Sequence, residues 1–226
     1  MDPEELSFKY SAILFDFDGT LTPSLPLWLK AYQLAMAQFG IKMTGDEVIQ
    51  SCFYRPWQDV VTEFELPSVQ HLEVKVLEGV EEAFLEAILF DGVMQTLDEC
   101  RRRGTKLAIV TSSVERVVSK FLRENNIHDY FGAVIAADHV TRHKPHPEPV
   151  YLALKNIKMQ AHQSLMVGDS SADLLAAHAA AVDKALFFPE DHHRFYNFEQ
   201  LKSHDPHIIF HDYSELLPHL RVTASA

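Results

Sequence analysis

The sequence predicts an α/β fold, in which helices cover a parallel β-sheet and a purely helical segment is inserted after the first strand. Two observations support this prediction. Short apolar runs alternate along the chain with stretches of helical periodicity, and this alternation specifies a parallel sheet with right-handed crossovers. The interval between the first run and the second is also far longer than any later one, which leaves room for a separate helical unit.

The first strand is predicted in the uncharged run at residues 11–15, which ends at two aspartates and a glycine. An apolar run bounded by a turn signal is typical of a strand buried on both faces, as in parallel sheets. Five further runs predict strands at residues 106–110, 133–136, 165–167, 185–188 and 207–210. Apolar residues spaced three and four apart predict helices between them, at 92–103 and in the stretches that begin at Val114 and Val150.

The segment 22–90 has helical periodicity throughout. One apolar stripe begins at Leu25 and another runs from Val69 to Ile88, and a structureless loop of this length is improbable in a compact domain. The insertion leaves the sheet beside the two aspartates, so it is well placed to act as a lid. We therefore expect residues 1–21 to begin the core domain, 22–90 to form a helical cap domain, and 91–226 to complete the core.

The composition is that of an ordinary globular protein, because 47% of the 226 residues are hydrophobic and 23% are charged. The net charge of −12 argues against nonspecific binding to nucleic acid or to an anionic membrane, which requires basic patches. Cys52 and Cys100 are too few for a disulfide framework and fit a reducing compartment. No stretch has the pattern of a membrane span or a signal peptide, so we expect a soluble cytoplasmic protein. Its oligomeric state stays open.

Asp16 and Asp18 follow the first predicted strand directly. Side chains alternate along a strand, so both carboxylates emerge on one side at its C-terminal end, where open α/β sheets bind ligands. At a separation of roughly 6 Å and an effective dielectric constant near 20, they would repel by about 3 kcal/mol. Such an arrangement implies a bound cation; the alternative is a solvated turn with two unrelated acids.

Three hydroxyl residues, Thr111, Ser112 and Ser113, come directly after the strand predicted at 106–110 and open a helix. Hydroxyl groups and free backbone N–H groups at a helix N-terminus suit a phosphate. Serine and threonine are also common helix caps at this place. Taken alone, the motif leaves both interpretations open.

Lys144 lies in a proline-rich turn before the next predicted helix. Pro145 biases Lys144 toward an extended backbone, and Pro149 suits the first turn of that helix. A lysine in such a stiffened turn can aim its ammonium group at one point. As an isolated feature, it would more often be an ordinary surface lysine.

Two further acids belong to the segment 168–173. Asp169 follows the strand predicted at 165–167, and Asp173 lies one turn into the next helix, where the helix dipole favours an acid. A helix cap with a first-turn acid would also explain this pair. Together with Asp16 and Asp18, however, Asp169 offers the hard oxygen ligands that Mg²⁺ prefers, with positions left for water and a substrate phosphate.

These motifs, in this order, resemble the haloacid dehalogenase superfamily. They are Asp-Phe-Asp-Gly-Thr-Leu at 16–21, Thr-Ser-Ser at 111–113, Lys144-Pro145, and Gly-Asp-Ser-Ser-Ala-Asp at 168–173. The helical insertion after the first motif looks like the subfamily that includes phosphoglycolate phosphatases and β-phosphoglucomutases. The resemblance implies a Rossmann-like parallel sheet core with an inserted helical cap.

The resemblance also implies a role for each motif residue. Asp16 would be the nucleophile that attacks phosphorus, giving an aspartyl-phosphate, and Asp18 would be the general acid and then the general base. Lys144 would offset charge on the nucleophile and the phosphate. Asp16, the backbone carbonyl of Asp18, and Asp169 would hold Mg²⁺, with Asp173 in support; Thr111 and Ser112 would bind phosphoryl oxygens.

The inserted segment offers Arg55 as the candidate for binding an anionic group of the substrate, because it lies in a loop-like stretch between helices. An exposed loop arginine is an equal alternative. This chain also departs from the family pattern, since many relatives have an acid where it has Thr22-Pro23-Ser24. That departure leaves the substrate open.

The leading hypothesis is a Mg²⁺-dependent phosphatase that acts on a small phosphorylated metabolite. A phosphomutase of the β-phosphoglucomutase kind would use the same motifs and differ in the acceptor of the phosphoryl group. A carbon–halogen hydrolase is disfavoured, because that branch lacks an acid at the position of Asp18. A non-catalytic sensor of phosphate esters is the remaining alternative, although every candidate catalytic residue is present.

Overall fold

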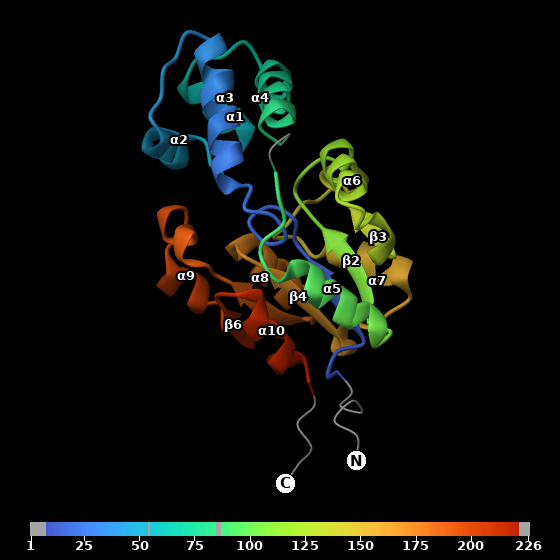
Figure 1. Cartoon of the computed structure of the whole chain (residues 1–226). Helices are drawn as coiled ribbons and strands as arrows, with labels where there is room; N and C mark the ends of the chain where they lie inside the picture. Colours follow the sequence, from blue (N-terminus) through green and yellow to red (C-terminus); the bar gives the residue numbers. More distant parts are fainter. Residues whose placement is uncertain (1–7, 54, 85–86, 222–226) are drawn as a thin grey trace, which may run out of the picture. The chain divides into compact units, whose positions relative to one another are not determined.

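The computed structural model describes residues 8–53, 55–84 and 87–221. The chain divides into two compact units (Figure 1). Met1–Thr22 and Leu89–Ala226 form the first, called the sheet unit, and Pro23–Ile88 form the second, called the helical unit.

Six parallel strands form one sheet in the order β3-β2-β1-β4-β5-β6 (Figure 1). They are β1 (Ala12–Phe15), β2 (Lys106–Val110), β3 (Ala133–Ile135), β4 (Ser164–Gly168), β5 (Asp183–Phe187) and β6 (Ile208–Phe210). This arrangement confirms the predicted α/β fold, and each predicted strand coincides with an observed one to within a residue or two. β1 lies at the centre between β2 and β4, so the residues that follow it emerge in the middle of the sheet edge.

Helices cover both faces of the sheet (Figure 1). α7 and α8 pack against one face and contact each other, while α5 and α10 lie together on the other. The α-helices described in this unit are α5 (Val93–Arg102), α6 (Glu115–Glu124), α7 (Glu148–Ile157), α8 (Ser171–Ala179), α9 (Phe198–Lys202) and α10 (Tyr213–Leu220).

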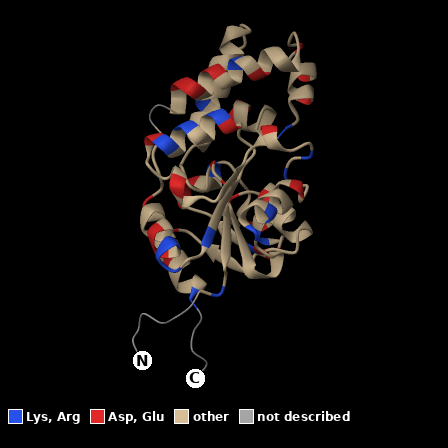
Figure 2. Ribbon diagram, turned by 90° about the vertical axis from the view of Figure 1, so that its right-hand side faces the viewer, with Lys and Arg blue, Asp and Glu red and all other residues tan. Residues whose placement is uncertain are grey.

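The central strand is buried on both faces, as its apolar sequence predicts. Ala12 and Leu14 belong to the apolar cluster that α7 and α8 cover. Ile13 and Phe15, which alternate with them, are also fully buried, and alternation places them on the opposite face. Figure 2 shows the corresponding charge pattern, with the Lys, Arg, Asp and Glu positions mainly on helices and loops and few on the strands.

The helical unit contains α1 (Leu25–Gln38), α2 (Gly45–Ser51), α3 (Trp57–Glu63) and α4 (Val69–Ala83). α1 and α4 pack closely, because a Cβ atom at Gly79 would lie 3.0 Å from the backbone of Ala31. The indole N–H of Trp57 donates to the Tyr32 hydroxyl at 2.8 Å. The predicted second stripe extends too far, since α4 ends at Ala83 and Ile88 is 64% exposed.

Glu99, Arg102 and Arg103 form an ion pair network at the C-terminal end of α5. Glu99 accepts from Arg102 at 2.9 and 3.0 Å and from Arg103 at 2.6 Å. The hydrogen bond from Arg102, opposed by burial and joined by the bond from Arg103, lowers the pKa of Glu99 to about 2. These charges also suit the helix dipole, whose C-terminal end favours basic residues.

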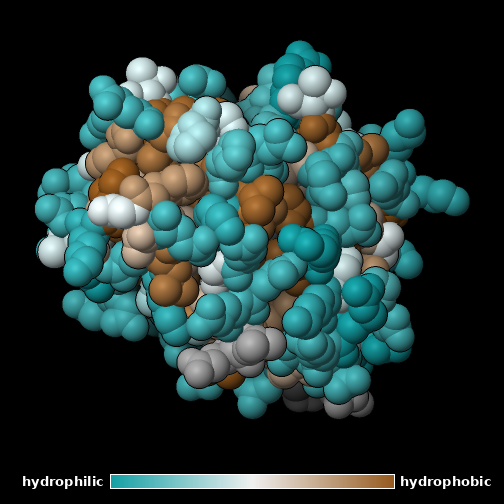
Figure 3. Space-filling view, turned by 90° about the horizontal axis from the view of Figure 1, so that it is seen from above, coloured by the Kyte–Doolittle hydropathy of each residue, from teal (hydrophilic) through white to brown (hydrophobic). Residues whose placement is uncertain are grey.

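The face of the molecule in Figure 3 is mostly hydrophilic, with separate hydrophobic patches between the polar side chains. Among the described residues, every helix is too short or too polar to cross a lipid bilayer.

Candidate active site

The site lies where three neighbouring strands of the sheet unit end. Asp16 follows β1 and its backbone N–H donates to the carbonyl of Val167 in β4 at 2.9 Å. Asp169 follows β4 directly. Because β1 and β4 are parallel neighbours, their ends bring these two acids to one edge, as the sequence predicts for an open α/β sheet.

Lys144 connects this edge to α8. Its Nζ atom lies 2.8 Å from Oδ1 of Asp16 and 2.6 Å from Oδ1 of Asp173, and it donates to the carbonyl of Val110 at 3.0 Å. Its side chain is 3% exposed, so this lysine is a buried residue and not the surface lysine of the alternative interpretation. Its ammonium group donates hydrogen bonds to Val110 and Asp173 and forms an ion pair with Asp16.

Asp173 is fixed by the N-terminus of α8. Ser170 caps the helix, and Oδ2 of Asp173 accepts from the backbone N–H and the hydroxyl of Ser170 at 3.1 and 2.6 Å. The preceding strand must come very close, because a Cβ atom at Gly168 would collide with the Asp173 side chain. The capping interpretation of this segment is therefore correct, and the same carboxylate also bonds Lys144.

Asp169 has no exposed surface and has a hydroxyl donor on each oxygen. The hydroxyl of Thr20 donates to Oδ1 at 3.2 Å, and that of Tyr196 donates to Oδ2 at 2.8 Å. Thr20 is held in turn, since its carbonyl accepts from the buried hydroxyl of Tyr213 at 2.8 Å.

Burial and mutual repulsion shift the acids of this site. Burial, followed by the charge of Asp173, raises the pKa of Asp16 to about 7, against the opposing effect of Lys144. Burial, then Asp173 and Asp16, raises the pKa of Asp169 as well. Burial alone would lower the pKa of Lys144, but Asp16 and Asp173 overcome that effect and raise it. The ammonium group of Lys144 therefore stays charged, whereas Asp16 and Asp169 resist ionisation.

The donor set fits a divalent cation. Carboxylate oxygens of Asp16, Asp169 and Asp173 all lie within 4.8 Å of one another, and all three residues are buried. Three carboxylates face one ammonium group, which leaves excess negative charge in a place shielded from water. Hard oxygen ligands of this kind are those that Mg²⁺ prefers, and a cation here would relieve the repulsion that raises the pKa values.

Asp18 lies in the turn after β1, and its charge reaches Asp16 and contributes to raising the pKa of that residue. Its Oδ2 atom accepts from the hydroxyl of Ser113 at 2.5 Å. In this buried cluster, the carboxylate oxygens that lie within 4.8 Å of one another come from the other three aspartates and not from Asp18.

The three hydroxyl residues after β2 differ in burial, because Thr111 and Ser113 are buried and Ser112 is exposed. Thr111 is buried, and its Oγ1 atom accepts from the backbone N–H of Ser113 at 3.0 Å. Ser112 is exposed at the surface of the same turn. This segment lies close to the acids. The hydroxyl of Ser113 donates to Asp18, and the carbonyl of Val110, the residue before Thr111, accepts from Lys144.

Arg55 belongs to the helical unit. Its Nη1 atom lies 2.5 Å from Oε2 of Glu63 and donates to the carbonyl of Ser51 at 3.0 Å. The Arg55 side chain is 32% exposed. The structure thus gives it an acidic partner within its own unit, and its predicted contact with substrate stays a prediction.

Among the residues that hold the acids, sequence reasoning missed Thr20, Ser113 and Tyr196. The first two lie inside the motifs already identified, where a hydroxyl beside an aspartate could have pointed to them. Tyr196 is distant in sequence and follows β5, in a segment without any motif, so only the fold brings it to Asp169.

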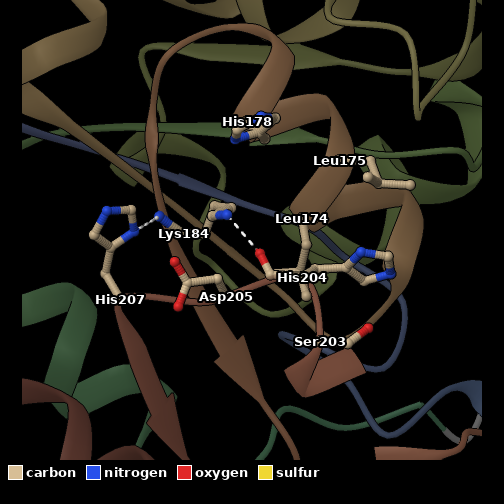
Figure 4. Close-up of a pocket in the computed structure, with 8 residues that line it drawn as sticks. All are labelled: Leu174, Leu175, His178, Lys184, Ser203, His204, Asp205 and His207. Atoms are coloured by element: carbon tan, nitrogen blue, oxygen red, sulfur yellow. Dashed lines mark hydrogen bonds between the residues drawn. The ribbon is translucent and has the colours of Figure 1, made fainter. Parts of the chain in front are cut away.

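A separate pocket lies away from these acids, between α8, β5 and the turn before β6 (Figure 4). Its polar groups bond to one another. The Nζ atom of Lys184 donates to the carbonyl of His204 at 2.6 Å, and its backbone N–H donates to Nδ1 of His207 at 3.1 Å. These bonds hold the turn against the strand, and none of the predicted site residues lines the pocket.

Comparison with known proteins gives a consistent result. Residues 13–187 match the family described as haloacid dehalogenase-like hydrolase. A phosphoglycolate phosphatase of Pseudomonas fluorescens (strain Pf0-1) is 29% identical over 224 residues, which cover 94% of this chain and 80% of the relative. A phosphoglycolate phosphatase of Yersinia pestis is 32% identical over 185 residues, which cover 76% of this chain and 79% of the relative.

Solved structures share the fold. CbbY from Rhodobacter sphaeroides, in complex with phosphate, has a TM-score of 0.80 at 22% identity, with 93% of this chain and 99% of that chain covered. A mutant of CbbY was also solved in complex with xylulose-(1,5)bisphosphate. At this identity the likeness establishes the shared architecture, and the family match rests on the sequence.

Proposed function

The chain belongs to the haloacid dehalogenase-like hydrolases and is a phosphoric monoester hydrolase, and we propose that it is a Mg²⁺-dependent phosphatase that acts on a small phosphorylated metabolite through an aspartyl-phosphate on Asp16. The observation that carries this proposal is the buried cluster in which one ammonium group contacts Asp16 and Asp173 beside Asp169. Phosphoryl transfer depends mainly on positioning and charge neutralisation, and this cluster supplies both.

Asp16 is the proposed nucleophile. A carboxylate oxygen of Asp16 forms a bond to phosphorus while the bond between phosphorus and the ester oxygen breaks, which leaves an aspartyl-phosphate. Lys144, 2.8 Å from Oδ1, favours the ionised form that this attack requires. Because Asp16 is only 6% exposed, its carboxylate is shielded from competing solvent.

Asp18 is the proposed general acid and base. It donates a proton to the departing ester oxygen, then takes a proton from the water that attacks phosphorus, so that inorganic phosphate leaves and the Asp16 carboxylate is restored. The hydroxyl of Ser113 bonds one oxygen of Asp18 at 2.5 Å and orients the group for this exchange.

Asp16, Asp169 and Asp173, with the backbone carbonyl of Asp18, are the groups that would hold the cation. Bound Mg²⁺ supplies positive charge that orients the phosphate and offsets its negative charge. In the proposal Thr111 and Ser112 bind phosphoryl oxygens, with Ser112 exposed and available to an incoming ligand.

Substrate selection is assigned in this proposal to the helical unit, acting as a cap, with Arg55 binding an anionic group of the substrate. The relatives named phosphoglycolate phosphatase make phosphoglycolate the first substrate to test. Arg55→Ala should then raise the KM for a doubly anionic substrate and leave the kcat for a simple aryl phosphate unchanged.

The test of the whole proposal is a screen of phosphoglycolate, sugar phosphates and nucleotides with and without Mg²⁺, ranked by kcat/KM. Asp16→Asn should abolish turnover, whereas Asp129→Asn, whose side chain is 92% exposed, should match the wild type. Retained turnover in the Asp16 variant would remove the nucleophile assignment. Activity that is insensitive to EDTA would remove the magnesium assignment.

A further inference from the structure

We propose that Tyr196 is a positioning residue for the magnesium site: its hydroxyl, together with that of Thr20, fixes the carboxylate of Asp169 in one orientation. The inference rests on the proposed function, because it assumes that Asp169 holds the cation. Tyr196 lies outside the four sequence motifs, and Thr20 is a motif residue with no assigned role.

The two contacts constrain both oxygens of one buried carboxylate. Tyr196 donates to Oδ2 at 2.8 Å and Thr20 donates to Oδ1 at 3.2 Å. Each carboxylate oxygen has two lone pairs, so one donor on each leaves the second lone pair free for another partner. The hydrogen bonds fix the rotation of the group without using up its capacity to bind a metal.

Tyr196 is itself held in place by its own segment. Its backbone N–H donates to the carbonyl of His192 at 2.9 Å, and the two rings lie with centroids 5.7 Å apart. The ring packs against a buried apolar cluster that includes Leu186 and Phe188 from the end of β5 and Leu174 from α8. The hydroxyl therefore comes from an anchored ring, which a positioning role requires.

The donors around Asp169 are neutral, in contrast to the ammonium group at Asp16 and Asp173. The ring of His192 lies near the oxygen that accepts from Tyr196, with its Nδ1 atom 3.8 Å from Oδ2 of Asp169. The hydroxyl groups of Tyr196 and Thr20 therefore orient the carboxylate of Asp169 and place no positive charge beside it.

Hydrogen bonds from outer residues typically change metal affinity by about 10- to 100-fold when they are removed. Tyr196→Phe deletes one hydroxyl and keeps the ring, so we expect Mg²⁺ alone to bind the full-length protein about 10-fold or more weakly in a calorimetric titration. Added Mg²⁺ should restore kcat to near the wild-type value, with the KM for substrate unchanged. The matched control is Tyr130→Phe, which also removes a hydrogen bond from a tyrosine to an aspartate. At the protein surface, the Tyr130 hydroxyl donates to Oδ1 of Asp98 at 2.5 Å.

The outcomes separate this inference from the proposed function. If the wild-type protein binds Mg²⁺ and Tyr196→Phe binds it equally well, the positioning role is wrong and the phosphatase proposal stands. A variant that loses stability in urea without Mg²⁺ but keeps its Mg²⁺ affinity also overturns the positioning role, since Tyr196 is then only structural. If the wild-type protein neither binds Mg²⁺ nor hydrolyses phosphate esters, the proposed function fails and this inference fails with it.

Discussion

Lys144→Met is the substitution whose effect follows most directly from the structure. It removes the one positive charge among the three partners Lys144, Asp16 and Asp173, and it keeps a side chain of similar length. The Lys144 side chain is 3% exposed and those of Asp16 and Asp173 are 9% and 0% exposed. The substitution therefore leaves two buried carboxylates without their ammonium partner.

Breaking a buried ion pair by removing one partner typically destabilises a protein by about 3–5 kcal/mol. Two pairs are lost here, but Asp16 can respond by binding a proton. The pKa of Asp16 is already raised to about 7 from its ordinary value of 3.8, so its ionised form in the folded state is unfavourable. That cost is absent below the ordinary pKa and grows as the pH rises toward the folded-state pKa. Loss of Lys144 raises the folded-state pKa further.

We therefore expect Lys144→Met to lose about 3–5 kcal/mol of unfolding free energy at pH 8 and at most half of that at pH 5.5. The measurement is urea denaturation in the presence of EDTA at both values of pH. The control is Lys120→Met, because that lysine is 50% exposed and lies 4.0 Å from Glu124, so it should change stability by less than about 0.5 kcal/mol. Adding Asp173→Asn to the Lys144 variant should restore part of the loss.

Two results would refute this reasoning. A loss below about 1 kcal/mol at pH 8 would show that the buried pair is energetically unimportant. An equal loss at both values of pH would show that the destabilisation comes from packing and not from unpaired charge.

Three other predictions follow from single features. Gly168→Ala should cost about 2 kcal/mol or more in urea denaturation, because its Cβ atom would collide with the Asp173 side chain; an unchanged midpoint would contradict this. Glu99→Gln should cost about 1 kcal/mol at pH 7, and the difference from wild type should vanish as the pH falls from 4.5 toward 2, since the folded-state pKa is lowered to about 2. Burial raises the pKa of Cys52 to about 11 and that of Cys100 to about 12, so a thiol reagent at pH 8 should modify both only after unfolding, and rapid reaction of the native protein would contradict this.

The fold could be predicted from the sequence because its strands are short apolar runs that end at polar motifs. β2 spans Lys106–Val110, which is the run that the sequence predicts. The polar residues that follow Val110 mark the end of this strand. β5 begins two residues earlier than its run, because Asp183 and Lys184 pair with β4 although they are polar. Strand pairing at the start of a strand needs only backbone groups, so hydropathy does not mark it.

The candidate site could be predicted only in part, because sequence identifies the end of each strand but not which hydroxyl turns toward which acid. The run Thr111-Ser112-Ser113 shows this limit. Ser113 donates its hydroxyl to an acid of the site, Asp18, whereas Ser112 is exposed. The turn after β2 decides this, and its geometry depends on the bond from Ser113 N–H to Thr111 Oγ1.

The distribution of donors around the acids explains why so much negative charge is tolerated at one sheet edge. Asp16 and Asp173 share the ammonium group of Lys144, and Asp169 has two neutral hydroxyl donors. A second lysine beside Asp169 would stabilise the metal-free protein more, but it would compete with a cation for the same oxygens. The observed arrangement instead leaves three carboxylates with one ammonium group, which is unfavourable in the metal-free protein, and in the proposed function a cation that binds the folded state would offset this excess of negative charge. Local instability of this kind is common where function requires it, and here it identifies the acids that a metal would serve.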